Sequence, residues 1–341
     1  MQLLAPRTGW LLAGNKLLWT EDNGLHWADV TPAMSLPNER VADVYFKDTN
    51  DGWVLVSASD DGPEAHFELA STVNSGASWE VTPVEVPGLN WRQIILYGAG
   101  GVYFLDSQRG WLQLDEQTGS AFRGALLLAT GDGGKTWVVE PSSGTGGRFL
   151  FVDANNGWVA GGPTGGEFYV TRDGGGTWQE VEPKVPPEIG PALGGLYGVA
   201  QIFADANHGY LPVSYPSARA LVLFATDDGG ATWRPHRVFK GLPFIGAIPY
   251  PSAVADSAWL TAFFNQSTLT MLRTSLRGGP HAVKTSRATI KRERVAGGFL
   301  PVLEMTFSTA EQGWIRTDRL LSTEDGGATW SEFSLWGPHR K

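Results

Sequence analysis

The 341-residue sequence predicts an all-β protein, a seven-bladed β-propeller of four-stranded antiparallel blades. Three observations predict it. An eight-residue pattern ending in tryptophan recurs along the chain, a second aromatic pattern precedes each copy, and helical periodicity is absent. A repeat of about 40–50 residues is typical of propeller blades. We therefore expect one domain over residues 1–341, although length alone would suggest two or three.

The eight-residue pattern reads Thr-x-Asp-x-Gly-x-Thr-Trp. Its copies begin 41–58 residues apart, at Thr20, Thr72, Thr130, Thr171, Thr226, Thr274 and Thr323. The copy at Thr274 is eroded, with Leu276 in place of the acid and His281 in place of the tryptophan. An Asp or Asn side chain accepts hydrogen bonds from backbone amides a few residues on, and glycine supplies positive φ, so each copy predicts a tight turn.

A turn-stabilising role, and no catalytic one, is therefore predicted for six side chains: Asp22, Asn74, Asp132, Asp173, Asp228 and Asp325. A calcium site would need several oxygens converging on one ion, and one acid per turn does not supply them. The six histidines have no HxxxH or HxH spacing. We expect no metal and no cofactor.

The second pattern is an aromatic residue after a small residue, at the start of an apolar strand: Trp10, Trp53, Trp111, Trp158, Tyr210, Trp259 and Trp314. Five of the seven units carry a Phe seven residues earlier, at Phe46, Phe104, Phe151, Phe203 and Phe307. The two patterns together place the blades at about 1–31, 40–85, 91–141, 147–183, 196–240, 245–295 and 300–336. Wide aromatics suit the gaps between twisted blades, and twelve of the fifteen tryptophans belong to the repeat.

Composition excludes several classes of protein. The chain has no cysteine, which removes disulfides, thiolate nucleophiles and Cys-based metal sites. A formal charge of −9 argues against a nucleic-acid partner. No apolar stretch approaches 18 residues, so no membrane span is predicted. The start, MQLLAPRTGW, carries no signal peptide, and a chain trimmed of its export signal would look the same.

The coupled patterns resemble the bacterial neuraminidase repeat, or Asp-box, of sialidases, sortilin-type receptors, xyloglucanases and photosystem II assembly factors. FVDANNGW from Phe151 and TRDGGGTW from Thr171 look most like the last of these. We expect a monomeric, non-catalytic binding or assembly scaffold with a protein or glycan partner. The resemblance implies export to the periplasm, cell surface or lumen.

A carbohydrate-active enzyme, hydrolase or lyase-like, is the alternative. The Arg-Ile-Pro of a sialidase is absent, and no catalytic residue is assigned. Glycosidase chemistry nevertheless needs only two facing carboxylates. Acids on the predicted strand 2–3 loops could supply them: Asp60, Asp61, Glu64, Asp115 and Glu116. Long segments from Ser57, Asp115, Pro183 and Ser214 would share that end of the blades, where loops on a rigid scaffold commonly bind ligands.

Three sets of residues are candidates for binding. Asp43, Arg148 and Glu304 lie three residues before a strand-1 Phe, so symmetry would place them around the central channel as a ligand pocket or as a solvated lining. Residues 273–294 carry seven Lys or Arg against one acid, as a docking patch for an acidic partner or as a cation-studded edge. Arg287, Lys291 and Arg292 represent that segment. Trp91, beside Arg92, lies outside the repeat and is a candidate ligand-stacking residue.

Overall fold

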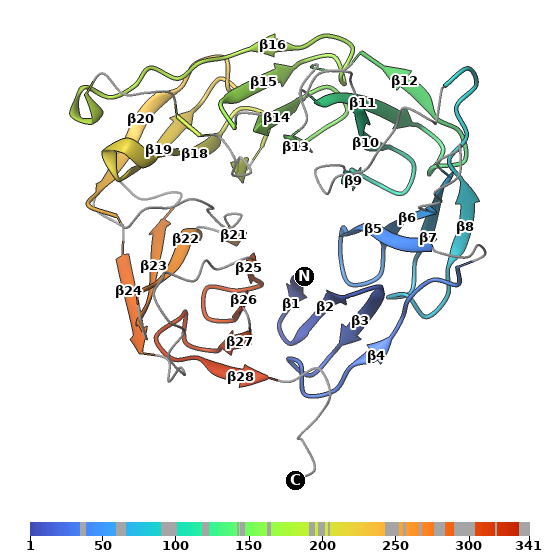
Figure 1. Cartoon of the computed structure of the whole chain (residues 1–341), viewed down its shortest axis with the longest axis horizontal. Helices are drawn as coiled ribbons and strands as arrows, with labels where there is room; N and C mark the ends of the chain where they lie inside the picture. Colours follow the sequence, from blue (N-terminus) through green and yellow to red (C-terminus); the bar gives the residue numbers. More distant parts are fainter. Residues whose placement is uncertain are drawn as a thin grey trace. The chain divides into compact units, whose positions relative to one another are not determined.

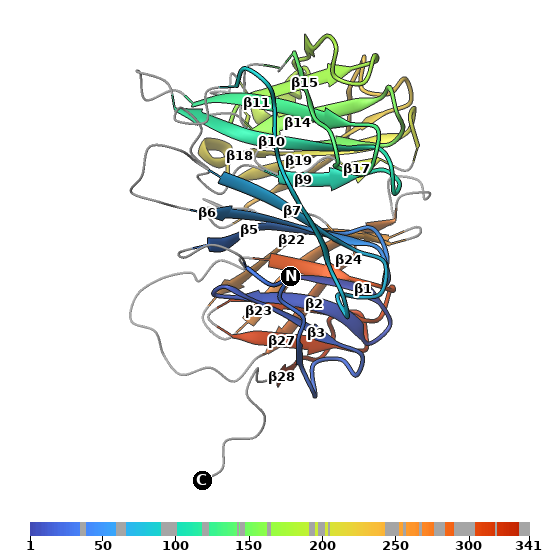
Figure 2. The same ribbon diagram turned by 90° about the vertical axis from the view of Figure 1, so that its right-hand side faces the viewer.

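The fold is an all-β propeller with four-stranded antiparallel blades, as predicted (Figures 1 and 2). The computed structural model describes residues 1–34, 39–58, 66–89, 101–117, 123–141, 143, 147–161, 165–190, 195–196, 202–203, 205–242, 252–254, 257–265, 268–275, 284–289, 304–317 and 319–333. These residues form seven four-stranded sheets, here called blades 1 to 7 in chain order. In the described part of the chain no helix is both long and apolar enough to cross a membrane.

The chain divides into two compact units. The first unit comprises Met1–Val30 and Pro243–Lys341. It holds blade 1, with β1 (Gln2–Ala5), β2 (Thr8–Ala13), β3 (Lys16–Thr20) and β4 (Ala28–Asp29). It also holds blade 6, with β21 (Ser252–Val254), β22 (Ser257–Asn265), β23 (Thr268–Ser275) and β24 (Lys284–Thr289). Its third sheet is blade 7, with β25 (Glu304–Phe307), β26 (Gly313–Arg316), β27 (Leu320–Thr323) and β28 (Ser331–Phe333).

The second unit comprises Thr31–Leu242 and holds four blades. Blade 2 has β5 (Glu39–Phe46), β6 (Gly52–Ala58), β7 (His66–Thr72) and β8 (Glu80–Pro83). Blade 3 has β9 (Gly101–Phe104), β10 (Gly110–Gln117), β11 (Arg123–Thr130) and β12 (Val138–Glu140). Blade 4 has β13 (Gly147–Phe151), β14 (Gly157–Gly161), β15 (Glu167–Thr171) and β16 (Gln179–Glu180).

Blade 5 completes this unit, with β17 (Ile202–Phe203), β18 (Gly209–Tyr215), β19 (Ala220–Thr226) and β20 (Arg234–Lys240). Two 3-10 turns, η2 (Pro187–Ile189) and η3 (Pro216–Ala218), lie in its connections. In every blade the four strands pair in chain order, so consecutive turns alternate between the two ends of the sheet. The strand 1–2 and strand 3–4 turns therefore share one end, and the strand 2–3 loops lie at the other.

Burial follows position within the blade. The second strand packs on both faces, and every residue of β6 is buried. The fourth strand covers less core, and three of the four residues of β8 are exposed. A strand buried on both faces reads as a continuous apolar run, which explains why GWVLVSA lacks the alternation of a half-exposed strand.

Aromatic stacking joins neighbouring blades of the second unit. The Trp that opens strand 2 lies against the strand-1 Phe of the next blade in three pairs: Trp53–Phe104, Trp111–Phe151 and Trp158–Phe203, with centroids 4.2, 3.8 and 3.5 Å apart. The same Phe also meets, edge-on, the Trp that ends the eight-residue pattern of its own blade. The planes of Phe151 and Trp178, for example, are 76° apart. Both predicted aromatic patterns are thus parts of one packing motif.

Blades 5 and 7 depart from this motif. Tyr210 replaces the tryptophan of blade 5 and meets His236 of its own blade edge-on, 5.4 Å between centroids. Leu3 takes the Phe position in blade 1, and Trp314 of blade 7 contacts Trp27 of blade 1 instead, at 5.9 Å. The eroded turn of blade 6 falls in residues 276–283, outside the described residues.

Candidate functional site

The turn that joins strands 3 and 4 repeats with one hydrogen-bond pattern in six blades. In blade 5 the Thr226 hydroxyl donates to Asp228 Oδ1 at 2.8 Å and accepts from the Gly230 N–H at 2.7 Å. Asp228 Oδ1 also accepts from the Thr232 N–H at 2.9 Å. The equivalent side chains are held alike: Asp22, Asn74, Asp132, Asp173 and Asp325.

These hydrogen bonds keep the turn carboxylates ionised. Partial burial would raise the pKa of Asp228, but hydrogen bonds from Thr232 and Thr226 outweigh it and lower the pKa to about 2. Hydrogen bonds from Thr136 and Thr130 likewise lower the pKa of Asp132 to about 2. A carboxylate with such a low pKa is a poor proton donor near neutral pH, so these groups are unsuited to general acid catalysis.

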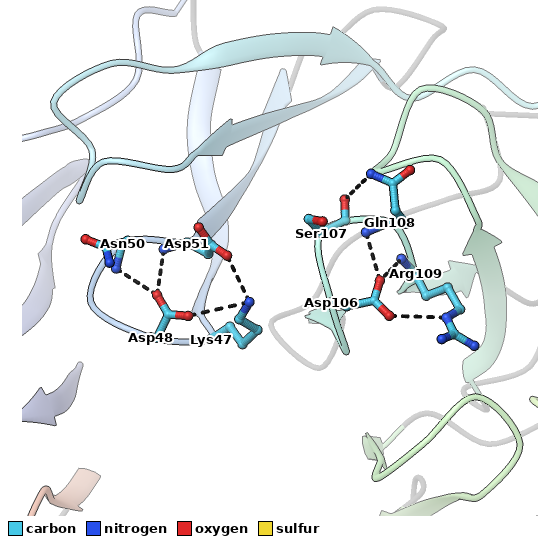
Figure 3. Close-up of polar contacts among 8 residues, drawn as sticks. All are labelled: Lys47, Asp48, Asn50, Asp51, Asp106, Ser107, Gln108 and Arg109. Atoms are coloured by element: carbon cyan, nitrogen blue, oxygen red, sulfur yellow. Dashed lines mark hydrogen bonds and ion pairs between the residues drawn. The ribbon is translucent and has the colours of Figure 1, made fainter.

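A second capped turn joins strands 1 and 2, and the sequence reasoning missed it. Asp48 Oδ1 accepts from the backbone N–H of Asn50 and Asp51, and Asp106 Oδ1 accepts from those of Gln108 and Arg109, all at 2.8–2.9 Å (Figure 3). Asp153, Asp205 and Thr309 cap the corresponding turns. The sequence does mark this turn, because an acid follows two residues after the strand-1 Phe, as in FVDANNGW.

In six of the blades, the strand 1–2 turn and the strand 3–4 turn also bind one another. The Gly133 N–H donates to Gln108 O, and the Gly174 N–H donates to Asn155 O, at 2.8 and 2.9 Å. The same link joins Asn23 to Arg7, Ser75 to Asn50, Gly229 to Asn207 and Gly326 to Glu311. The polar groups at this end of the blades are therefore largely used by the protein itself.

Long side chains connect these turns between adjacent blades. Arg172 of blade 4 donates to Asn156 Oδ1 at 3.0 Å and to the Asp228 and Gly229 carbonyls of blade 5. Its guanidinium lies 5.7 Å from the centroid of Trp158. In the first unit, Glu324 of blade 7 accepts from Asn23 of blade 1 at 3.3 Å. The same position of the repeat supplies both contacts.

Asp43 and Arg148, two of the predicted binding residues, lie on first strands of the second unit. Asp43 follows a bulge in β5, and its Oδ2 accepts from the Val102 N–H of β9 at 2.9 Å. Burial raises the pKa of Asp43, and the positive charge of Arg148 on β13 opposes that rise. The pair therefore combines a half-buried carboxyl group that accepts from a backbone amide with an exposed cation that acts on it electrostatically.

Glu304, the third member of this set, lies in the first unit on β25. Its Oε2 is 3.0 Å from the backbone nitrogen of Met1 and 3.5 Å from an Arg316 guanidinium nitrogen. Glu304 and Arg316 face one another across the β25–β26 pair. Glu304 is therefore ion-paired within its own unit.

The structure does not describe the side chains of the remaining predicted binding residues or of the candidate loop acids. Trp91, Arg92, Lys291 and Arg292 lie outside the described residues, as do the loop acids Asp60, Asp61 and Glu64. Arg287 lies on β24 opposite Thr270, and Asp115 and Glu116 end β10; only their backbones are described. Within the described ranges, no three His, Asp or Glu side chains are grouped so as to hold a metal ion.

Some side chains form hydrogen bonds with the backbone of the first strand of the next blade, and the sequence did not predict them. The Gln113 amide donates to Gly147 O at 2.7 Å, and the Tyr103 hydroxyl donates to Phe151 O at 2.6 Å. In the first unit Thr306 Oγ1 accepts from the Leu3 N–H. Each satisfies a backbone group on a strand with one free edge. Gln, Tyr and Thr occupy these positions in different blades, so no recurring residue type marks them.

Solved structures of similar fold include two of YCF48. "YCF48 bound to D1 peptide" has a TM-score of 0.52 at 17% identity, over 89% of this chain and 86% of that one. YCF48 from Cyanidioschyzon merolae has a TM-score of 0.53 at 19% identity, over 89% and 88%. The GH74 xyloglucanase of Xanthomonas campestris has a TM-score of 0.54 at 14% identity, over 86% of this chain and 45% of that one. At these identities the similarity is one of fold.

No protein-family model matches the sequence, and no curated protein matches it.

Proposed function

We propose that this chain is a non-catalytic scaffold that binds a protein partner through the strand 2–3 loops of a single seven-bladed Asp-box propeller. The observation that carries the proposal is the hydrogen bonding of the turns. At the end opposite those loops, the two turns of each of six blades are joined by a backbone hydrogen bond, and the acids in these turns accept hydrogen bonds from residues of their own turn. Such an end suits a rigid support, which leaves the loops as the variable part that can recognise a partner.

Two further observations support a protein partner. The first is the fold similarity to YCF48, a protein whose solved structures include one with a bound D1 peptide. The second is that the loop at η3 is ordered by its own contacts. Arg219 Nε donates to Leu242 O at 3.0 Å, and the Arg219 N–H donates to Pro216 O. A pre-ordered loop loses less conformational entropy on binding.

Export to the periplasm, cell surface or lumen is part of the same proposal and rests on the family resemblance. A glycan is a second possible ligand, and Trp91 with Arg92 would be its stacking site. Asp43 with Arg148 in the second unit, and Glu304 in the first, would be polar binding residues, and Arg287, Lys291 and Arg292 would form a basic docking patch. We expect a monomer, because the partner and not a second copy would cover the loops.

Affinity capture tests the scaffold function. The immobilised chain is incubated with an extract of its source cell, and captured proteins are identified by mass spectrometry. A variant with residues 59–65, which follow β6, replaced by a short Gly-Ser turn should lose a specific partner and keep its melting temperature. The control variant keeps the full chain length. It carries threonine in place of Val138 and Val139, two exposed residues on the last strand of blade 3. Identical capture by loop variant and wild type would contradict the proposal.

The enzyme alternative rests on the fold similarity to the GH74 xyloglucanase and on acids at the end of β10. Incubation with a panel of oligosaccharides, including xyloglucan fragments, separates the two functions. The scaffold proposal predicts no turnover above buffer. Turnover by the wild type that is lost in Asp115→Asn or Glu116→Gln would contradict the scaffold function and indicate a glycosidase.

A further inference from the structure

The fourth strand of blade 5 differs from the other fourth strands of the second unit in length and charge. β20 has seven residues, whereas β8, β12 and β16 have four, three and two. It is the last strand of its sheet, so one edge of its backbone has no partner strand within the described residues (Figure 1). Very short fourth strands leave few unpaired groups, and β20 does not have this protection.

β20 also concentrates positive charge in a chain of net charge −9. Its sequence is RPHRVFK, while the other three strands read EVTP, VVE and QE. Arg234 forms a bidentate ion pair with Asp227 at 2.9 and 2.7 Å. Arg237 and Lys240 have no carboxylate partner in the described part of the chain, and Lys240 donates to the Glu188 carbonyl of η2. The strand therefore keeps two positive charges that no described acid neutralises.

The strand is held firmly in position. Val238 packs against the cluster that includes Trp158 and Phe224, and the contact of Lys240 with Glu188 fixes its far end. A bulge at His236 shifts the register between Leu223 and Phe224. Beyond the bulge, residues 237–240 pair regularly with β19. The open edge is consequently preformed over residues 237–240. Before this stretch, Pro235 has no backbone N–H to donate.

We infer that the open edge of β20 binds an extended acidic segment of a protein partner as a fifth strand of blade 5. Backbone pairing supplies affinity in this mode, and side chains supply selectivity. The unneutralised Arg237 and Lys240 attract glutamate or aspartate and repel the β20 strand of a second copy, so the same charges select the partner and oppose self-association. This inference rests on the proposed protein-binding function and assigns it a second contact surface.

A labelled peptide tests the inference directly. The probe is a ten-residue fluorescein-tagged peptide that alternates glutamate with valine, titrated with the full chain and followed by fluorescence anisotropy. We expect saturable binding that weakens as salt rises, because exposed charges are screened. The variant Arg237→Glu reverses the charge and leaves the contact of Lys240 with Glu188 in place, and it should weaken binding by at least about ten-fold. The matched control, Lys135→Glu, makes the same charge change on an exposed turn of blade 3 and should bind like wild type.

Hydrogen exchange separates strand addition from simple charge attraction. Bound peptide should slow amide exchange in residues 236–240, and a peptide with proline at alternate positions should not bind despite equal charge. Absence of binding, equal loss of binding in Arg237→Glu and Lys135→Glu, or unchanged exchange would overturn the inference. So would a dimer in sedimentation velocity that Arg237→Glu disrupts, since a second copy would then occupy the edge. Partner capture that depends on residues 59–65 would survive each of these failures, so failure of this inference can be told apart from failure of the proposed function.

Discussion

The indole of Trp111 and the ring of Phe151 lie parallel at 1°, with centroids 3.8 Å apart, although the two residues belong to different blades. Both are buried. The position of Phe151 is set from its other side by Gly157, the residue before the next strand-2 Trp. A Cβ on Gly157 would lie 2.6 Å from the Phe151 ring. The Gly-Trp dipeptide and the Phe therefore form one unit of packing.

Gly157→Ala should destabilise the protein by about 1–3 kcal/mol, because the added methyl group must displace a fully packed ring. Chemical denaturation monitored by circular dichroism measures the change. Gly131→Ala is the matched control, since a Cβ there meets nothing within 4 Å. Its unfolding free energy should change by less than about 0.5 kcal/mol. Equal effects at the two sites would contradict this account of the Gly-Trp pattern.

Arg172→Ala should cost about 1–2 kcal/mol, because it removes charge-assisted hydrogen bonds to the Asp228 and Gly229 carbonyls and to Asn156. Arg172→Lys should not restore the stability, since a lysine lacks the planar fork that reaches several acceptors at once. Thermal unfolding compares the two variants with Lys135→Ala, a change on an exposed turn residue. Full rescue by lysine would show that charge alone matters at this contact.

Acid should weaken the strand 3–4 turns, and Asp228 gives the clearest test. Its folded pKa is lowered from 3.8 to about 2, so it contributes stability above the unfolded pKa that is lost between about pH 4 and pH 2. Asp228→Asn keeps the acceptor oxygen, as Asn74 does in blade 2, and removes the titration. The Asn variant should lose less stability than wild type over this pH range, whereas Asp228→Ala should be less stable at pH 7. Parallel pH profiles for wild type and Asn variant would refute the prediction.

His236 should make the protein less stable as pH falls below about 6.5. Burial lowers the pKa of His236, and the charges of Arg237 and Arg234 add to that effect. The folded state therefore binds fewer protons than the unfolded state, and stability declines from the unfolded pKa down to the lowered folded one. His236→Phe should flatten the melting temperature between pH 7 and pH 5. An unchanged slope would assign the decline to other groups.

Much of the blade structure is predictable from the sequence because its residues repeat. The tryptophan at position 111 and the phenylalanine at 151 recur in several units, so their spacing is visible in the amino-acid sequence itself. Periodicity predicts four strands per unit, and each sheet of the described residues has four. It also suggests a turn role for Asp173, whose hydrogen bonds to Thr171 and Thr177 match that role.

The candidate site is far less predictable, because its residues do not repeat. Gln113 and Tyr103 cap neighbouring strands through contacts that depend on blade geometry, and nothing in their spacing indicates this. Asp43 and Arg148 share a position in the repeat, yet the amide that Asp43 accepts from belongs to another blade. The charge of β20 is hard to single out in the sequence, because the basic segment at 273–294 carries more positive charge and lies close behind it.

The stacked rings also provide a built-in optical reporter. Trp53, Trp111 and Trp158 lie at joints between blades of the second unit, so their fluorescence depends on how closely adjacent blades pack. Separation of two blades would expose an indole to water even if each sheet kept its hydrogen bonds. A red shift in emission that precedes loss of the far-ultraviolet β signal would then distinguish parting of the blades from unravelling of the strands.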